Sequence, residues 1–156
     1  MLPVSRPWLP SMEKLAEKLA TPWETGILTH NGPLVIEFEK RLEEMWGVRN
    51  VVAVSNGTMA IQLALRALDI RGEVITTPFT WIITSHAISS LGAKPVFVDV
   101  DENFNLDPSK IEQAINKKTK AIVPMHVAGK LCSMKEIHNI ANKYKLKIIE
   151  DAAQSI

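Results

Sequence analysis

Residues 148–154 of this 156-residue chain read Ile-Ile-Glu-Asp-Ala-Ala-Gln. The apolar pair follows a lysine-rich stretch with helical spacing, residues 133–147, which is typical of a buried strand that leads directly into a charged side chain. In an open α/β sheet, ligands bind outside the carboxyl ends of the strands. We therefore expect the carboxylate of Asp151 to project into a crevice at that edge of the sheet.

Short β-branched runs alternate with helical patterns throughout the chain after residue 50. The five runs are residues 51–54, 73–77, 95–100, 121–125 and 147–150. Their hydrophobicity is continuous rather than alternating, which indicates a sheet that is covered on both faces. Strands alternating with helices predict a parallel sheet joined by right-handed crossovers. The predicted fold class is therefore α/β, a parallel sheet with flanking helices.

The first fifty residues show helical and loop patterns but no strand pattern. Residues 1–10 are proline-rich and predict an irregular arm. Apolar positions at helical spacing predict one helix from Met12 that ends at Thr21-Pro22, and a second from Val35 that ends at Gly47. We place a domain boundary here: residues 1–48 form the arm and helices, and residues 49–156 form the α/β domain.

One further helix has a different pattern. Residues 59–68 are apolar nearly all round. A helix with that pattern is expected to be buried on every side.

Composition excludes several function classes. The net charge is +1 and no Lys/Arg cluster stands out, so we expect no nucleic-acid partner. The single cysteine, Cys132, cannot form an internal disulfide and fits a reducing compartment, and the opening residues do not resemble a signal peptide. The apolar run at residues 81–93 is too short and too polar to span a bilayer. The four histidines are not spaced as the ligands of a metal site are. We expect a cytoplasmic protein without a metal or a membrane partner.

Four sites near predicted strand ends have both a functional and a structural interpretation. Gly57 and Thr58 open a helix where free N–H groups could bind an anion, or they could belong to an ordinary N-cap. Trp81 could lie on an aromatic cofactor or simply begin a buried helix. Asp151 could bind a positive ligand group, cap the following turn, or pair with a nearby lysine. His126 could be a catalyst, but a lone histidine is more often a structural hydrogen-bonding group.

Four segments occur in a joint order that resembles a known family. They are Asn-Gly-Pro at 31–33 with Phe-Glu at 38–39, Ser-Asn-Gly-Thr-Met-Ala at 55–60, Val-Asp-Val-Asp at 98–101, and Glu-Asp-Ala-Ala-Gln at 150–154. With residues 118–122, His126 and Gly129, this order resembles the DegT/DnrJ/EryC1/StrS family of sugar aminotransferases from about residue 31 to residue 154. The resemblance implies part of the large domain of a fold-type I enzyme that uses pyridoxal 5'-phosphate (PLP).

The resemblance implies a role for each cofactor-binding residue. Gly57 and Thr58 match the turn that holds the cofactor phosphate, and Trp81 matches the aromatic side chain that stacks on the pyridine ring. Asp151 matches the carboxylate that pairs with the ring nitrogen, so it is the catalytic residue that this chain supplies. Gln154 matches the amide that approaches the phenolic oxygen of the ring.

The same resemblance implies the substrates. They are a nucleotide-linked keto-sugar and an amino donor, glutamate, in the biosynthesis of polysaccharide or secondary-metabolite sugars. Asn31 and His126 are implied as residues of the substrate pocket, and the full-length enzyme is implied to be a homodimer.

The resemblance also implies that the chain is truncated. In the family, the lysine that forms the Schiff base with PLP follows the Asp-Ala-Ala-Gln segment by a few tens of residues, and the small C-terminal domain comes later. Both are expected to lie beyond Ile156, so PLP binding to this chain is expected to be weak or absent. Two alternatives follow: an inactive truncated homologue, or a chain that completes its sheet with a partner. A third is a PLP-dependent sugar dehydratase with histidine in place of the lysine.

Overall fold

The structure of the protein, a computed structural model, describes residues 7–155. It divides into two compact units with a boundary between Ala53 and Val54. The sequence pattern places this boundary slightly earlier, after residue 48. Residues 1–6 of the expected arm and Ile156 lie outside the described residues.

The first unit contains helices α1 (Met12–Thr25) and α2 (Pro33–Trp46). The prediction that the first helix ends at Thr21-Pro22 is wrong, because α1 continues through Pro22 to Thr25. Proline lacks an N–H and so loses one helical hydrogen bond, but here it lies in the last turn, where its own carbonyl accepts the N–H of Gly26 at 2.9 Å. One missing bond near the helix end is tolerated.

The predicted strand at residues 51–54 does not form among the described residues. The N–H of Ala53 instead donates to Oε1 of Glu39 at 2.7 Å, and the N–H of Val51 donates to Oε1 of Glu43 at 3.1 Å. The spacing of the two donors matches that of the two acceptors. Val51 and Ala53 are two residues apart in an extended segment, which spans about 6.7 Å, and Glu39 and Glu43 are four residues apart on a helix, which rises about 6 Å. The carboxylates of α2 therefore accept the backbone hydrogen bonds that the carbonyl groups of a neighbouring strand would otherwise accept.

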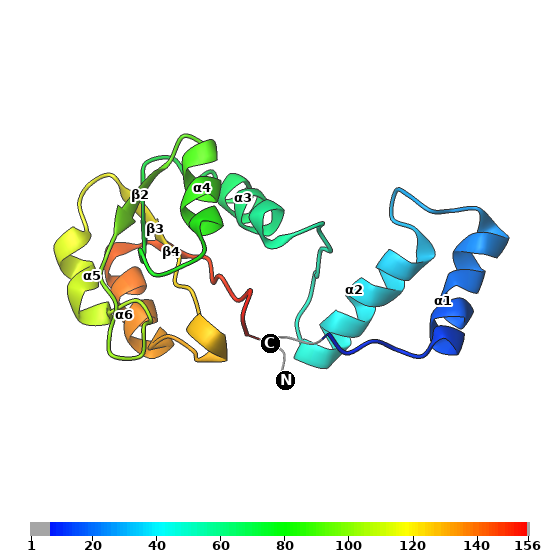
Figure 1. Ribbon diagram of the computed structural model, residues 1–156. Coiled ribbons are helices and arrows are strands. Elements are labelled where there is room, and N and C mark those ends of the chain that lie inside the picture. Colours follow the sequence, from blue (N-terminus) through cyan, green and yellow to red (C-terminus); the bar gives the residue numbers. More distant parts are fainter. Residues whose placement is uncertain (1–6, 156) are drawn as a thin grey trace. The chain divides into compact units, whose positions relative to one another are not determined.

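The second unit is a four-stranded parallel sheet with helices on both faces (Figure 1). The strand order is β2-β1-β3-β4 and all three pairings are parallel. Its elements in chain order are α3 (Gly57–Ala67), β1 (Glu73–Thr76), α4 (Ile82–Ser90), β2 (Lys94–Phe97), α5 (Pro108–Ala114), β3 (Thr119–Ile122), the 3-10 turn η1 (Val127–Gly129), α6 (Met134–Tyr144) and β4 (Lys147–Ile148).

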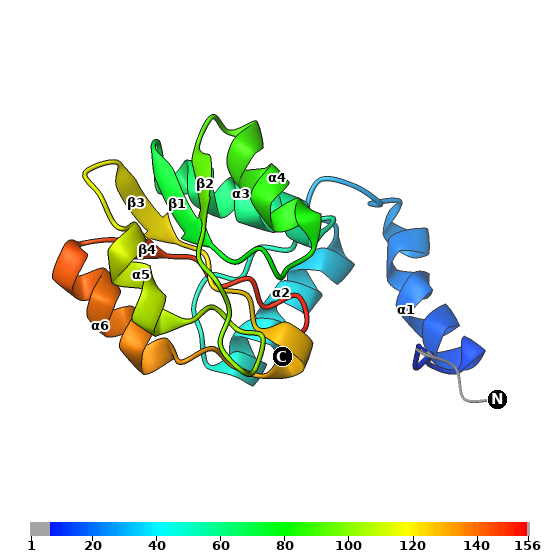
Figure 2. The same cartoon turned by 60° about the vertical axis from the view of Figure 1, so that its left-hand side comes forward.

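Helices cover both faces of this sheet, which confirms the prediction from the continuous apolar runs. Figure 2 shows the sheet between the α3–α4 pair and the α5–α6 pair. On one face Val74 packs with Leu65 of α3 and Ile88 of α4. On the other, the adjacent Ile75 packs with Ile111 of α5 and Ile137 of α6. Successive strand residues point to opposite faces, so the central strands β1 and β3 contribute to both clusters.

The expectation that residues 59–68 form an entirely buried helix is wrong. In α3 only one side is buried, through Ile61 and Leu65, while Met59, Leu63 and the following Leu68 are exposed. A helix that lies on one face of a sheet buries one stripe, and within the second unit no further layer covers its other side. Apolar composition alone did not distinguish these two situations.

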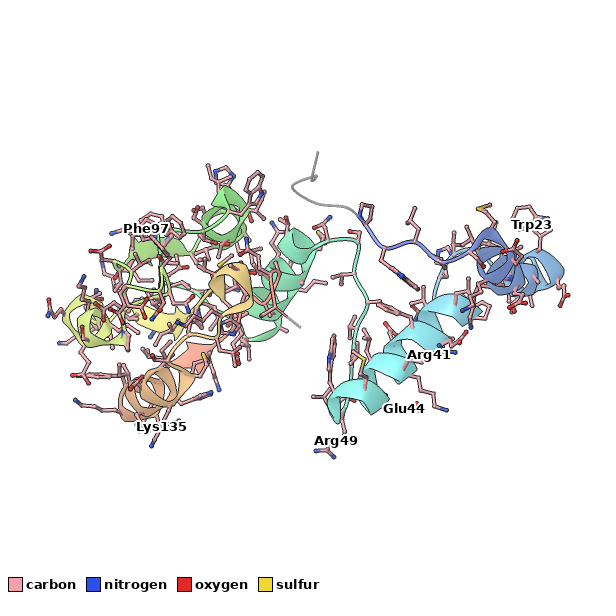
Figure 3. All side chains as sticks on the ribbon, turned by 60° about the horizontal axis from the view of Figure 1, so that its bottom comes forward. Trp23, Arg41, Glu44, Arg49, Phe97 and Lys135 are labelled. Carbon is pink, nitrogen blue, oxygen red and sulfur yellow. The ribbon has the colours of Figure 1, made fainter. Side chains whose placement is uncertain are left out.

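Charged and aromatic side chains lie on the surfaces of both units. Figure 3 shows the side chains of Trp23 on α1 and of Arg41 and Glu44 on α2, directed away from their helices, and Lys135 on the outer side of α6. Among the described residues, no helix combines the length and apolar character needed to cross a bilayer.

Candidate functional site

Asp151 lies at the carboxyl edge of the sheet. Its N–H donates to the carbonyl of Pro124 at 2.8 Å, and its own carbonyl accepts the N–H of His126 at 3.1 Å. These bonds continue the β3–β4 pairing past the ends of the strands, with Met125 opposite Asp151. The backbone that carries the carboxylate is therefore fixed by the sheet.

The Asp151 side chain is only 8% exposed and has two hydrogen-bond donors. The hydroxyl of Thr84 donates to Oδ2 at 2.8 Å, and the N–H of Ala153 donates to Oδ1 at 3.3 Å. The second bond is the turn cap that the sequence offered as an alternative, whereas no ion pair among residues 7–155 involves Asp151. A carboxylate has about four acceptor positions, so this one can still accept from a ligand.

A cavity of about 360 Å³ opens beside this carboxylate. It is lined by Gly57, Thr58, Ile61, Trp81, Ile83, Thr84, Asp151, Ala153 and Gln154. All five residues predicted to bind the cofactor are in this set, although they come from three separate segments: the start of α3, the start of α4 and the turn after β4. The sheet topology brings these segments together because each follows the carboxyl side of its strand or extended run.

The start of α3 has free donors at this cavity. The side chain of Asn56 accepts the N–H of Met59 at 3.0 Å, so the capping interpretation is correct for that donor. The N–H groups of Gly57 and Thr58 have no acceptor among the described residues. A Cβ built on Gly57 would meet nothing within 4 Å, so packing within the described chain does not require glycine there. Two free N–H groups at a helix start are suited to a phosphate.

Trp81 and Gln154 lie at the rim of the cavity. Trp81 is the N-cap of α4 and is 74% exposed, so Trp81 itself is not buried at the start of that helix. The carboxamide oxygen of Gln154 accepts the N–H of Ala128 at 2.7 Å. That bond fixes the amide and leaves its NH₂ group as the donor available to a ligand.

A smaller hollow of about 260 Å³ shares this rim. Trp81 and Gln154 line it together with Phe79, and the ring of Phe79 stacks on that of Phe104 at a centroid distance of 5.1 Å. A larger hollow of about 500 Å³ is lined by Ile70 and Arg71, which precede β1, and Gly92, which precedes β2. It lies at the amino ends of those strands, away from the edge where α/β sheets bind ligands.

His126 lines neither of the two hollows at the carboxyl edge. The residue is 1% exposed, with Nε2 2.9 Å from Oε2 of Glu150 and Nδ1 accepting the N–H of Cys132 at 3.3 Å. Because Nδ1 accepts a hydrogen bond, Nε2 carries the ring proton, and this N–H group donates a hydrogen bond to Glu150. This geometry supports the structural interpretation of His126. Burial raises the pKa of the adjacent Cys132 thiol, which keeps that thiol protonated and unreactive.

Asn31 belongs to the first unit, in the loop between α1 and α2, with a left-handed φ of 58°. Sequence reasoning missed Thr84, which supplies a donor to the Asp151 carboxylate from 67 residues away. No local pattern identifies it, because a threonine inside a helix gives no signal of a contact so distant in sequence. Among the described residues, no group of three or more His, Cys, Asp or Glu side chains could hold a metal ion.

Comparisons with known proteins identify relatives of this chain. The chain is 45% identical over 155 residues to the dTDP-4-amino-4,6-dideoxy-D-glucose transaminase of Escherichia coli, covering 99% of this chain and 42% of that protein. It is 44% identical over 127 residues to the UDP-2-acetamido-2-deoxy-3-oxo-D-glucuronate aminotransferase of Pseudomonas aeruginosa, covering 80% of this chain and 35% of that protein. The chain thus spans about two fifths of the length of these relatives.

A solved structure gives the same result for the fold. The crystal structure of NtdA from Bacillus subtilis, with the bound cofactor PMP, superposes with a TM-score of 0.86 at 39% identity, covering all of this chain and 38% of that one. The α/β fold with a parallel sheet predicted from the sequence is confirmed, and its structural neighbours are fold-type I aminotransferases. Residues 11–156 match the family itself, so the chain belongs to the DegT/DnrJ/EryC1/StrS aminotransferase family.

Proposed function

We propose that this chain is the N-terminal part of a PLP-dependent aminotransferase that transfers an amino group from glutamate to a nucleotide-linked keto-sugar. The observation that carries the proposal is the Asp151 carboxylate. It is buried, lines a cavity at the carboxyl edge of the sheet, and has acceptor capacity that no cation in the described chain uses. A buried charge without a cationic partner is costly, so a positively charged ligand group is expected to meet it.

The residues present fit PLP. A protonated pyridine nitrogen suits the open acceptor positions of Asp151, and a phosphate suits the free N–H groups of Gly57 and Thr58. The exposed indole of Trp81 offers an aromatic face for the ring. The free NH₂ group of Gln154 is a donor suited to the phenolic oxygen.

PLP, when bound, supplies an electron sink for amino transfer. The task of this chain is to bind and orient that group. Oδ1 or Oδ2 of Asp151 would accept a hydrogen bond from the protonated ring nitrogen and so keep the proton there. The start of α3 would anchor the phosphate, and Trp81 would restrict the tilt of the ring. Three anchors from separate segments would together define the position and the plane of the ring, which is what oriented catalysis requires.

The substrate assignment rests on the relatives. The names of two of them specify a dTDP-linked and a UDP-linked sugar, and a third is a GDP-perosamine synthase. We extend to this chain the class of nucleotide-linked sugars, with Asn31 as a pocket residue and a homodimer as the working assembly. The single cysteine is buried and free, in agreement with the reducing cytoplasm in which we place the protein.

The test of the cofactor site is a titration of the chain with PLP followed by calorimetry. We expect weak, reversible binding that the Asp151→Asn variant weakens by about tenfold, because a charge-assisted hydrogen bond contributes about 1.5–3 kcal/mol. The matched control is Asp99→Asn, since Asp99 is exposed on a loop and pairs with Lys110.

Two results would contradict the proposal. Equal weakening by both asparagine variants would mean that Asp151 has no specific role. A borohydride-stable PLP adduct at a single lysine of this chain would mean that the Schiff-base lysine does not lie outside residues 1–156.

A further inference from the structure

Two threonine hydroxyls form a hydrogen-bonded chain that ends on the Asp151 carboxylate. The hydroxyl of Thr84 lies 2.8 Å from Oδ2 of Asp151, and the hydroxyl of Thr80 lies 2.9 Å from that of Thr84. The Thr84 side chain is 1% exposed, so water does not compete for its hydroxyl.

The direction of the two bonds follows from proton counting. An ionised carboxylate can only accept, so the single hydroxyl proton of Thr84 points to Asp151. The oxygen of Thr84 must then accept the proton of Thr80. The order of donation is therefore Thr80 to Thr84 to Asp151.

The contact is unusual for a hydroxyl inside a helix. Such hydroxyls commonly donate to a carbonyl three or four residues earlier in the same helix. The other hydroxyl residues of α4 follow this rule: Ser85 donates to Ile82, Ser89 to Ser85 and Ser90 to Ala87. Thr84 alone among them leaves its own helix and reaches the segment after β4. Helix stability does not require this bond, since the local alternative exists.

The bond completes the fixation of the carboxylate. The Thr84 hydroxyl holds Oδ2 while the N–H of Ala153 holds Oδ1, so rotation of the carboxylate about its χ2 angle would break one bond or the other. The orientation of the remaining acceptor positions is then fixed, and Thr84 and Asp151 line the same cavity.

We propose that Thr84 is a positioning residue that fixes the plane of the Asp151 carboxylate toward a protonated ring nitrogen, and that Thr80 orients the Thr84 hydroxyl. This inference rests on the proposed function, because it takes the ring nitrogen of PLP as the ligand group. A fixed carboxylate binds that group without the entropy cost of orienting first.

The test compares two ligands and three variants of the full chain. The ligands are PLP and its analogue with C–H in place of the ring nitrogen, and calorimetry gives the dissociation constant of each. Thr84→Val removes the hydroxyl with nearly the same shape, and Thr84→Ser keeps it. Thr76→Val is the matched control, because Thr76 is also buried but donates to the carbonyl of Val123 instead.

The measured quantity is the preference for PLP over the analogue. We expect Thr84→Val to reduce this preference by about fivefold or more, as for the loss of one hydrogen bond to a charged group. Thr84→Ser and Thr76→Val should retain it. Thr80→Val should reduce it by a smaller factor, because Thr80 acts through Thr84. An unchanged preference in Thr84→Val, with circular dichroism showing an intact fold, would overturn the proposal.

A ligand-free measurement separates this inference from the proposed function. In Thr84→Val the carboxylate can rotate, so hydrogen exchange of the Ala153 N–H should accelerate, whereas Thr76→Val should leave it unchanged. If the wild-type chain bound neither ligand, the proposed cofactor site would fail while the Ala153 exchange would still decide the positioning role. Equal exchange in all variants would overturn that role even if PLP bound.

Discussion

Leu65 in α3 and Leu19 in α1 are leucines of amphipathic helices in the two units, yet they are 1% and 41% exposed. The difference is general. The second unit holds all the buried hydrophobic side chains that form the two clusters on the sheet, whereas α1 buries only Pro22 and α2 buries no residue. The same helical pattern therefore specifies a helix in both units but a core in only one.

Local signals explain why both units still have well-defined helices. In α1 the Ser11 side chain accepts the N–H of Lys14, and α2 begins with Pro33 at its first position. Both helices end on a glycine with a left-handed φ, 67° at Gly26 and 62° at Gly47. Caps of this kind define where a helix begins and ends, while packing supplies most of its stability.

The largest expected difference between the units is in core substitutions. Leu65→Ala should lower the free energy of unfolding of the second unit by about 2–5 kcal/mol, because it leaves a cavity in a packed cluster. Leu19→Ala, at a half-exposed position, should cost less than about 1.5 kcal/mol. Native-state hydrogen exchange resolves each unit separately. Equal losses would show that α1 is packed as tightly as α3.

A second expected difference concerns two glycines with positive φ. Gly72 has a φ of 131°, and a Cβ there would lie 2.5 Å from the carbonyl oxygen of Lys118. Gly47 has a φ of 62° with nothing within 4 Å. Gly72→Ala should therefore cost more than the roughly 1–3 kcal/mol of backbone strain, and Gly47→Ala about 1–2 kcal/mol. Denaturant titration of both variants measures this, and a smaller loss at Gly72 would contradict the steric argument.

A third expected effect is local to residues 50–53. Glu39→Ala removes the acceptor of the Ala53 N–H, so hydrogen exchange of that amide should accelerate by about tenfold, the equivalent of about 1.4 kcal/mol. Glu44→Ala is the control, since that side chain lies on the same helix and points away from it (Figure 3). If both variants changed the Ala53 exchange rate equally, loss of α2 rather than loss of the acceptor would be the cause.

The smallest expected effects come from one exposed ion pair in each unit. A hydrogen bond from Lys18 lowers the pKa of Glu37 between α1 and α2, and one from Lys143 lowers the pKa of Glu112 between α5 and α6. A lowered pKa in the folded state stabilises the fold above the ordinary glutamate pKa, and this stabilisation is lost as the pH falls through the folded pKa.

The matched variants are Lys18→Met and Lys143→Met. Each should be slightly less stable than the wild type near neutral pH, and the deficit should disappear as the pH falls below the glutamate range. Added salt should reduce it as well, since exposed pairs are screened. Thermal unfolding at several pH values measures the deficit, and one that grew toward acid pH would contradict the sign of the pKa shifts.

The amino-acid sequence by itself determined the fold class, the end of α2 at Gly47, the position of Gly57 and Thr58 at the start of a helix, and the positions of Trp81 and Asp151 after strands. These are local properties, because apolar runs, caps and glycine turns act within a few residues. The family resemblance then assigned those positions to one cofactor, and the family itself was confirmed by comparison.

Only the tertiary structure decided what the distant contacts are. It showed that Val51 and Ala53 donate to carboxylates of α2, that α3 buries one side, and that His126 donates to Glu150 rather than lining a cavity. It also brought the Thr84 hydroxyl to Asp151. Such contacts join residues that are far apart in the chain, so the packing of helices on the sheet creates them and no local pattern encodes them.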